Sequence, residues 1–388
     1  MKSKYKLAFV IGILIGVFLI LLIISQISAA LEPKLLWKKE IPSFVWQIDF
    51  ARYSGDVIFA HEGNRITMFD KNGNTKWQWG PHLDKLAGSP LISDDGKHFI
   101  YSSYPTGGET DYMKGTYIHY CESNGREIWK KEEPLLVPST ISPDGKYIVL
   151  GVPGGWGGGA EFLDSNGKLL WKIEGSGLET LFSPDGNYLA VFSNIYDVRG
   201  NIYNNKPIQG NYNSFSNNGE YIGIEKIYFD PNIEIGPDEG LYDKKGNLVF
   251  PGKNAISGSG KIVISYLKNK IEAYRFPEKI KIAEYPIKRW RFPFCNALNY
   301  RFKYSKISYD GRYVAIFGER TDTKTPYSLF VIDINENKIW GVAIPGIEYE
   351  ERGENIFSMS FTNDGKYLMF LHTNQKAEKS TLYFYQIQ

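Results

Sequence analysis

Histidine, cysteine and serine are the side chains that most often supply catalytic or metal-binding chemistry, but in this sequence they form no known motif. His61-Glu62 lacks the second histidine of a zinc-peptidase helix, and neither a Gly-x-Ser-x-Gly elbow nor a Gly-Lys-Ser/Thr phosphate loop occurs. Cys121 and Cys295 are too few for a cysteine-rich metal site, and whether they pair stays open. We therefore expect no catalytic residue, no metal and no cofactor, and an enzyme is the less favoured interpretation.

Two stretches imitate ligand-binding motifs. Residues 155–160 fit the glycine-rich dinucleotide fingerprint, but residues 161–164 lead into another turn and not into the helix that would bind a pyrophosphate. Asp70, Asn72 and Asn74 have the alternate spacing of a calcium loop but lack its bidentate glutamate. A hydrogen-bonded Asx turn that closes a hairpin is the simpler interpretation of this second stretch.

Residue types that are common in protein interfaces occur in three places. Arginine and large aromatic residues are enriched at binding hot spots. The candidates are a basic-aromatic insertion with Arg289, Trp290, Arg291, Phe292, Tyr300, Arg301 and Phe302, an acidic segment with Glu348, Glu350 and Glu351, and Trp156 in its glycine-rich loop. Alternatively, the aromatic residues fold back over a central channel, the acids are solvated or pair with the basic insertion, and Trp156 covers its neighbours.

A repeated turn organises the chain that carries these candidates. The motif Ser-x-Asp/Asn-Gly is followed by aromatic and β-branched residues and recurs at Ser93, Ser142, Ser183, Ser216, Ser257, Ser308 and Thr362, with a degenerate copy at Tyr53-Ser54-Gly55. Asp-Gly and Asn-Gly tolerate the positive φ that tight hairpin turns require. The flanking segments, such as Tyr147 to Leu150, read as short strands.

A second motif follows the first in most units. An acid precedes a glycine by three residues and an aromatic residue by seven, in Asp70…Trp77, Glu122…Trp129, Asp164…Trp171 and Asp243…Phe250, while Asp333…Trp340 lacks the glycine. Two hairpin turns per unit imply four strands per unit, and the units average about 44 residues, which is typical of propeller blades. The recurrence of tryptophan at one position of the unit predicts packing between blades.

These motifs resemble those of quinoprotein-like (PQQ-like) and WD-repeat-like β-propellers. The Asp-x-x-Gly-x-x-x-Trp stretches resemble the first group and Ser-Pro-Asp-Gly-Lys-Tyr at 142–147 resembles the second. The resemblance covers about residues 34–388 and implies the fold far more strongly than a function. A quinone-dependent dehydrogenase would commonly use an adjacent Cys-Cys pair, a tryptophan platform and calcium, and the adjacent pair is missing here.

Ring closure follows from the two ends of the repeat region. The last unit ends with a third strand at 381–387, and the first begins with an additional strand at 34–40, whose Leu35 to Lys38 is identical to Leu169 to Lys172 in an outer-strand position. We expect these segments to pair and close an all-β, eight-bladed propeller of four-stranded antiparallel blades, with seven blades as the alternative. Both turn motifs then share one face, and the long insertions lie on the opposite face.

The first thirty residues predict a membrane segment. Residues 1–6 are a basic tail with Lys2, Lys4 and Lys6. Residues 7–24 are an unbroken apolar run that continues through Ile27 and Ala30, so residues 7–30 are long enough to span a bilayer, which leaves 31–388 for the propeller. Cleavage of a signal near Ala30, giving a secreted protein, is the alternative. The formal net charge is +2, so nucleic acid is not an expected partner. We expect a single-pass, extracytoplasmic scaffold that binds another envelope protein, with a propeller enzyme or a structural envelope component as alternatives.

Overall fold

The computed structural model describes residues 33–61, 64–80, 85–105, 115–133, 136–152, 159–174, 180–208, 211–225, 239–267, 270–286, 300–320, 328–343, 355–374 and 378–387. Within these ranges no helix is both long and apolar enough to cross a membrane. The apolar run at 7–30 lies outside them, so the predicted anchor stays a prediction.

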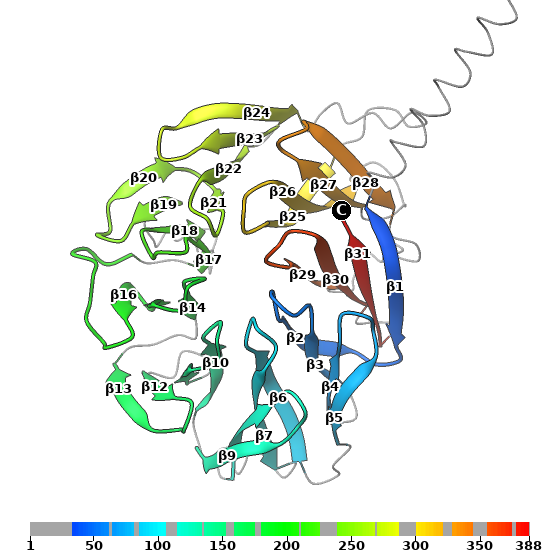
Figure 1. Ribbon diagram of the computed structural model, residues 1–388, viewed down its shortest axis with the longest axis vertical. Helices are drawn as coiled ribbons and strands as arrows, with labels where there is room; N and C mark the ends of the chain where they lie inside the picture. The colour runs from blue at the N-terminus through cyan, green and yellow to red at the C-terminus, as the bar shows by residue number, and fades with distance from the viewer. Residues whose placement is uncertain are drawn as a thin grey trace, which may run out of the picture.

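Eight antiparallel sheets form the blades of a closed ring (Figure 1), which confirms the predicted β-propeller. Blades 1 to 4 consist of β2 (Val45–Phe50), β3 (Val57–His61), β4 (Arg65–Phe69) and β5 (Thr75–Trp79); β6 (Lys85–Ile92), β7 (His98–Pro105), β8 (Tyr117–Glu122) and β9 (Glu127–Glu132); β10 (Val137–Ile141), β11 (Tyr147–Gly151), β12 (Ala160–Asp164) and β13 (Leu169–Ile173); and β14 (Thr180–Phe182), β15 (Tyr188–Val191) and β16 (Asn194–Asp197).

Blades 5 to 8 complete the ring. They consist of β17 (Asn211–Phe215), β18 (Tyr221–Glu225), β19 (Gly240–Asp243) and β20 (Leu248–Pro251); β21 (Asn254–Ile256), β22 (Ile262–Leu267), β23 (Lys270–Arg275) and β24 (Ile280–Pro286); β25 (Tyr300–Ile307), β26 (Tyr313–Arg320), β27 (Ser328–Asp333) and β28 (Lys338–Ala343); and β29 (Asn355–Phe361), β30 (Tyr367–Asn374), β31 (Lys379–Gln386) and β1 (Lys34–Ile41).

The core lies between neighbouring blades. Second strands such as β3, Val57-Ile58-Phe59-Ala60-His61, are buried along their whole length because a blade is covered on both faces. The outer-strand tryptophans reach across to the next blade. The Nε1 of Trp129 donates to the carbonyl of Ser165 at 3.0 Å, and its ring lies over Gly167, whose φ is +77°. A side chain at Gly167 would meet the indole, which explains the glycine in the Asp-x-x-Gly turn.

Both turn motifs form as predicted. In the first, the buried Ser142 Oγ donates to Asp144 Oδ1 at 2.8 Å and accepts from the N–H of Tyr147 at 2.9 Å, while Gly145 has a φ of +73°. In the second, Asp70 Oδ1 accepts from the N–H groups of Asn72 and Asn74, both at 2.8 Å. Burial raises the pKa of Asp70, but these hydrogen bonds outweigh it and hold the pKa below its ordinary value. The Asx-turn interpretation is therefore confirmed.

The ends of the described chain close the ring. β1 pairs antiparallel with β31, with Lys34 opposite Gln386 and Ile41 opposite Ser380, and a bulge falls at Leu36. The Trp37 ring stacks on Phe384 with centroids 5.2 Å apart, and Trp37 Nε1 donates to the carbonyl of Lys71 in blade 1 at 2.8 Å. Closure by the predicted segments is confirmed, to within two residues at each end.

The fourth blade corrects the prediction that every blade has four strands. Only β14, β15 and β16 pair there, and a single bridge between Tyr196 and Ile202 stands where the outer strand should run. The buried Asn204 completes the edge instead. Its Oδ1 accepts from the N–H of Ile195 at 2.8 Å, and its Nδ2 donates to the carbonyl of Ser193 at 3.0 Å. The unit is the shortest in the repeat. The amide of Asn204, together with backbone hydrogen bonds from Tyr203 to Ile195 and from Ile208 to Ser193, replaces the outer strand.

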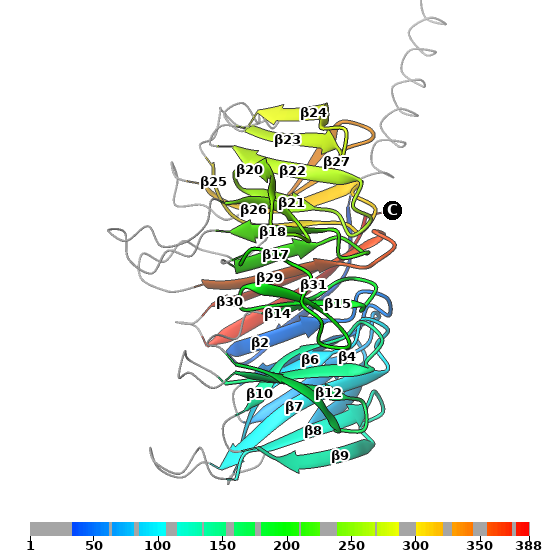
Figure 2. The same cartoon turned by 90° about the vertical axis from the view of Figure 1, so that its left-hand side faces the viewer.

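The strand directions separate two faces of the ring. The Ser-x-Asp-Gly and Asp-x-x-Gly turns all lie on one face, which we call the turn face and which forms the right-hand edge of Figure 2. The connections between second and third strands, and between blades, start from the opposite, connection face. β1 begins at the turn face, because Lys34 lies opposite Gln386 at the end of a third strand.

Candidate functional site

Most of the predicted binding residues lie outside the described residues, in segments between strands that end at the connection face. The flanking strands end there: β11 and β12 flank Trp156, β24 and β25 flank the basic-aromatic insertion, and β28 and β29 flank the acidic segment. The residues outside the described ranges are Trp156, Arg289, Trp290, Arg291, Phe292, Glu348, Glu350 and Glu351. Their role as a binding surface stays a prediction.

Tyr300, Arg301 and Phe302 are strand residues and not part of a loop, which corrects the predicted extent of the insertion. They open β25, the inner strand of blade 7, and lie opposite Arg320, Glu319 and Gly318 of β26. The alternation of aromatic and basic residues from Tyr300 to Tyr304 has the period of a strand, and this signal was available in the sequence. The structure therefore places these three residues beside the central channel, at its connection-face end.

One group of side chains has the order of a serine-hydrolase triad. Ser103 Oγ and His119 Nε2 are 2.8 Å apart, and His119 Nδ1 and Glu127 Oε2 are also 2.8 Å apart. The sequence analysis did not connect them, because they come from β7, β8 and β9 and meet only when the strands pair. The imidazole stacks on Tyr101 with ring centroids 4.5 Å apart.

This Ser-His-Glu group has the geometry of a structural network and not of an active site. Ser103 is 1% exposed and His119 is 6% exposed, so the hydroxyl does not reach a substrate. A related group in blade 1 joins His61 to Ser43 Oγ at 3.0 Å and to Thr67 Oγ1 at 3.1 Å. Hydrogen bonds of this kind satisfy polar side chains that are buried between blades.

Acidic side chains also meet at the turn-face end of the channel, in blades 1 and 2. Asp49 Oδ2 accepts from the N–H of Ile92 at 2.8 Å, and Arg52 Nε donates to Asp94 Oδ1 at 2.8 Å. Burial, with a smaller contribution from Asp94, raises the pKa of Asp49 to about 7. Because both carboxylates are already used in joining the two blades, we interpret this cluster as an inter-blade clamp.

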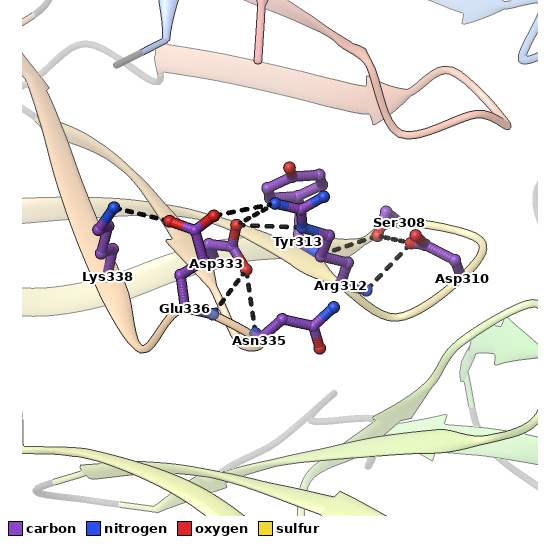
Figure 3. A network of polar contacts seen from close by, with 8 residues as sticks. All are labelled: Ser308, Asp310, Arg312, Tyr313, Asp333, Asn335, Glu336 and Lys338. Atoms are coloured by element: carbon purple, nitrogen blue, oxygen red, sulfur yellow. Dashed lines mark hydrogen bonds and ion pairs between the residues drawn. The ribbon is translucent and has the colours of Figure 1, made fainter. Parts of the chain in front are cut away.

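The turn face is hollowed between blades 6 and 7 by an open groove of about 450 Å³, lined by Lys261, Ile262, Arg275, Phe276, Pro277, Glu278, Asp310, Gly311, Arg312 and Asn335. Its blade-7 wall is held by a polar network (Figure 3), in which Arg312 Nη2 donates to the buried Asp333 Oδ2 at 2.8 Å. Asp333 Oδ1 accepts from the N–H groups of Asn335 and Glu336.

The opposite wall of the groove, in blade 6, carries cations that are not neutralised. Lys261 and Arg275 form no ion pair within the described part of the chain, and Glu278 is the acid on the same wall. Arg312 is already engaged by Asp333, a contact that raises the pKa of the guanidinium. The groove can therefore hold an anionic group, and it offers no buried nucleophile or base for chemistry.

Sequence reasoning missed this groove because it arises from a missing motif. Blade 6 has Phe276-Pro277-Glu278-Lys279 where the other blades have Asp-x-x-Gly or a close variant. Phe276 turns inward and packs edge-on against Tyr221, with centroids 4.7 Å apart. The usual Asp-x-x-Gly turn is absent from blade 6, and this absence was the available signal.

The described residues contain no group of three or more histidine, cysteine or acidic side chains placed to hold a metal ion. Cys121 is a buried free thiol, and burial raises its pKa to about 12. Cys295 lies outside the described ranges.

The comparisons with known proteins bear on the fold. No family model matches the sequence, and no curated protein matches it. Among solved structures 944 chains match, so the fold is common and does not by itself indicate a function. One match is BamB from Moraxella catarrhalis, which is 12% identical, superposes with a TM-score of 0.51, and covers 91% of this chain and 99% of its own. At this identity the similarity shows the β-propeller fold alone.

Proposed function

We propose that the protein is a membrane-anchored, extracytoplasmic scaffold that binds another envelope protein through its connection face, without catalysis. The observation that carries the proposal is the division of the ring into two unlike faces. The turn face is built from short hydrogen-bonded hairpins, and the chain enters the ring from it at Lys34. The segments richest in arginine, aromatic and acidic residues all leave from the other face.

The orientation follows from the predicted anchor. If residues 7–30 span the bilayer with the lysines on the cytoplasmic side, the turn face is the membrane-proximal one and the connection face points outward. Loops on a rigid scaffold are the usual place for recognition, because they can vary without cost to the core. The similarity to BamB supports a propeller of this architecture and says nothing of a ligand.

Site-specific photocrosslinking in native membranes tests the proposal. A photoreactive amino acid replaces Trp290, in the segment between β24 and β25, or, as the matched control, the exposed Asn166 on the turn face. We expect a defined protein adduct from position 290 and none from position 166. Arg289→Glu with Arg291→Glu should abolish the adduct if the basic-aromatic insertion recognises an acidic partner surface.

Equal adduct yields at positions 290 and 166, or a yield unchanged by the charge reversal, would contradict the proposal. The alternative of a propeller enzyme predicts acidic or amide side chains that converge in a connection-face pocket. In the described residues the converging carboxylates Asp49 and Asp94 lie at the turn-face end and are occupied by hydrogen bonds.

A further inference from the structure

Exposed apolar side chains follow a positional pattern on the outer strands. Within the described chain, every large apolar side chain that is exposed on an outer strand lies among the first three residues of that strand, next to the turn face. They are Leu35 and Leu36 in β1, Ile128 in β9, Leu169 and Leu170 in β13, Leu248 in β20, Ile280 and Ile282 in β24, and Ile339 in β28. Between 36% and 52% of each of these side chains stays exposed in the described chain, so packing within the propeller does not account for all of their apolar surface.

Three consecutive blades concentrate this pattern. The outer strands β24, β28 and β1 follow one another along one sector of the ring (Figure 1). They carry Leu35, Leu36, Ile280, Ile282 and Ile339, which are 44%, 42%, 52%, 38% and 36% exposed. We call these five residues the apolar rim. An exposed apolar cluster beside charged residues marks a surface that contacts a protein or a membrane.

Positive charge accompanies the apolar rim. Lys34 precedes the two leucines, and Lys279 and Lys281 flank Ile280. The groove between blades 6 and 7 adds Lys261 and Arg275, which have no carboxylate partner among the described residues. The acids of the same outer strands, Glu40 in β1 and Glu284 in β24, lie toward the connection-face ends, although Lys281 still reaches Glu284 at 2.8 Å. Apolar residues with lysine and arginine beside them are suited to an anionic lipid interface.

The short length of chain between the predicted anchor and β1 indicates that the apolar rim faces the membrane. The segment that is predicted to cross the bilayer comprises residues 7–30, in which 7–24 are an unbroken apolar run, and only residues 31 and 32 separate this segment from Pro33. Three residue steps span at most about 10 Å even when fully extended. Leu35 and Leu36 begin the strand that follows, so a membrane-spanning run holds this edge of blade 8 close to the lipid headgroups.

We propose that the apolar rim rests against the bilayer, and that Lys261 and Arg275 in the groove face the phosphate groups of anionic lipids. The ring is then tilted relative to the membrane plane, with blades 6 to 8 closest to the membrane and blade 3 farthest from it. This inference rests on the membrane anchor of the proposed function.

The chain provides its own matched control, because Leu-Leu-Trp-Lys occurs both at 35–38 in β1 and at 169–172 in β13. Leu36 and Leu170 are 42% and 40% exposed and hold the same position in their blades. A spin label is attached to Leu36→Cys or to Leu170→Cys in the full chain. Cys295→Ser is present in both variants, and Cys121 stays because it is buried. The protein is reconstituted in vesicles of phosphatidylethanolamine and phosphatidylglycerol.

The collision rate of the spin label with oxygen, which concentrates in the bilayer, is compared with its collision rate with a water-soluble nickel chelate. We expect the label at position 36 to be more accessible to oxygen than to nickel, and the label at position 170 to show the reverse. Lys261→Glu with Arg275→Glu should shift the label at position 36 toward the aqueous behaviour. Equal aqueous accessibility at positions 36 and 170 would overturn the inference.

Two further outcomes separate the inference from the proposed function. Alkaline carbonate is applied to the same vesicles. If it releases the chain, the anchor is wrong and the inference falls with it; if the chain is retained while the label at position 36 is aqueous, only the inference is wrong. Spin–spin broadening between labels at position 36 would show that a second copy covers the apolar rim and would also overturn the assignment to lipid.

Discussion

Blades 8 and 4 both lack an outer strand in sequence order, and they complete their edges in different ways. Blade 8 takes β1 from the start of the described chain, with a full antiparallel ladder and the stacked pair Trp37 and Phe384. Blade 4 has no fourth strand, and the side-chain amide of Asn204 completes its edge together with backbone hydrogen bonds from Tyr203 and Ile208. The difference teaches that an open edge must be satisfied, but a strand is needed only where the ring itself has to close.

Loss of the closing contact should have the largest effect. Trp37→Ala removes a half-buried indole, its stacking on Phe384 and its hydrogen bond to Lys71, so we expect the free energy of unfolding to fall by about 2–3 kcal/mol. Trp171→Ala is the control, because Trp171 stacks on Phe162 in blade 3 with centroids 4.3 Å apart. Denaturant unfolding of both variants measures the loss.

Hydrogen exchange then distinguishes the two tryptophan variants. Trp37→Ala should increase exchange in β1, whereas Trp171→Ala should leave β1 protected, because only Trp37 belongs to the closing strand. Equal exchange of β1 in both variants would show that the indole of Trp37 has no special part in closure.

The edge of blade 4 should respond less strongly. Asn204→Ala leaves the N–H of Ile195 without its acceptor, while the carbonyl of Ser193 keeps its hydrogen bond from the N–H of Ile208, and we expect a loss of about 1–3 kcal/mol in unfolding free energy. Asn201→Ala is the matched control, since the exposed amide of Asn201 donates only to Asp197, and its effect should stay within about 0.5 kcal/mol. Equal effects of the two changes would show that Asn204 does not replace a strand.

Capping by a carboxylate should add a pH dependence that capping by an amide lacks. Asp49 accepts from the N–H of Ile92, and burial raises its pKa from 3.8 to about 7. Between these values the folded state binds more protons than the unfolded state, so this group makes stability fall as pH rises from about 4 to about 7. Asp49→Asn should flatten the dependence over this range, measured by thermal unfolding at several pH values. An unchanged slope would contradict the assignment.

The turns and the closing strand of this fold can be predicted from the sequence. Features that arise where a strand or a turn motif is missing cannot be predicted in this way. The turns around Ser142 and Asp70 are encoded within a few residues, and the identical tetrapeptides at 35–38 and 169–172 reveal the closing strand. Asn204 was not predictable in the same way, because its role depends on which backbone groups blade 4 leaves open. The groove at Phe276 was missed for a similar reason, since it exists where a turn motif is lacking.

The candidate site was predicted less completely than the fold. Composition alone singles out the basic-aromatic and acidic segments, and the structure assigns the strands that flank them to one face. The Ser103, His119 and Glu127 group could not be read from the sequence, because antiparallel pairing brings together residues up to 24 positions apart.

Hydrogen exchange of the unmodified full chain tests the central claim, closure of the ring by β1, most directly. The amides of Lys34–Ile41 should exchange as slowly as those of β31, because both strands belong to one sheet. Complete exchange of β1 at the shortest labelling time, with β29 to β31 still protected, would contradict closure and with it the assignment of the two faces.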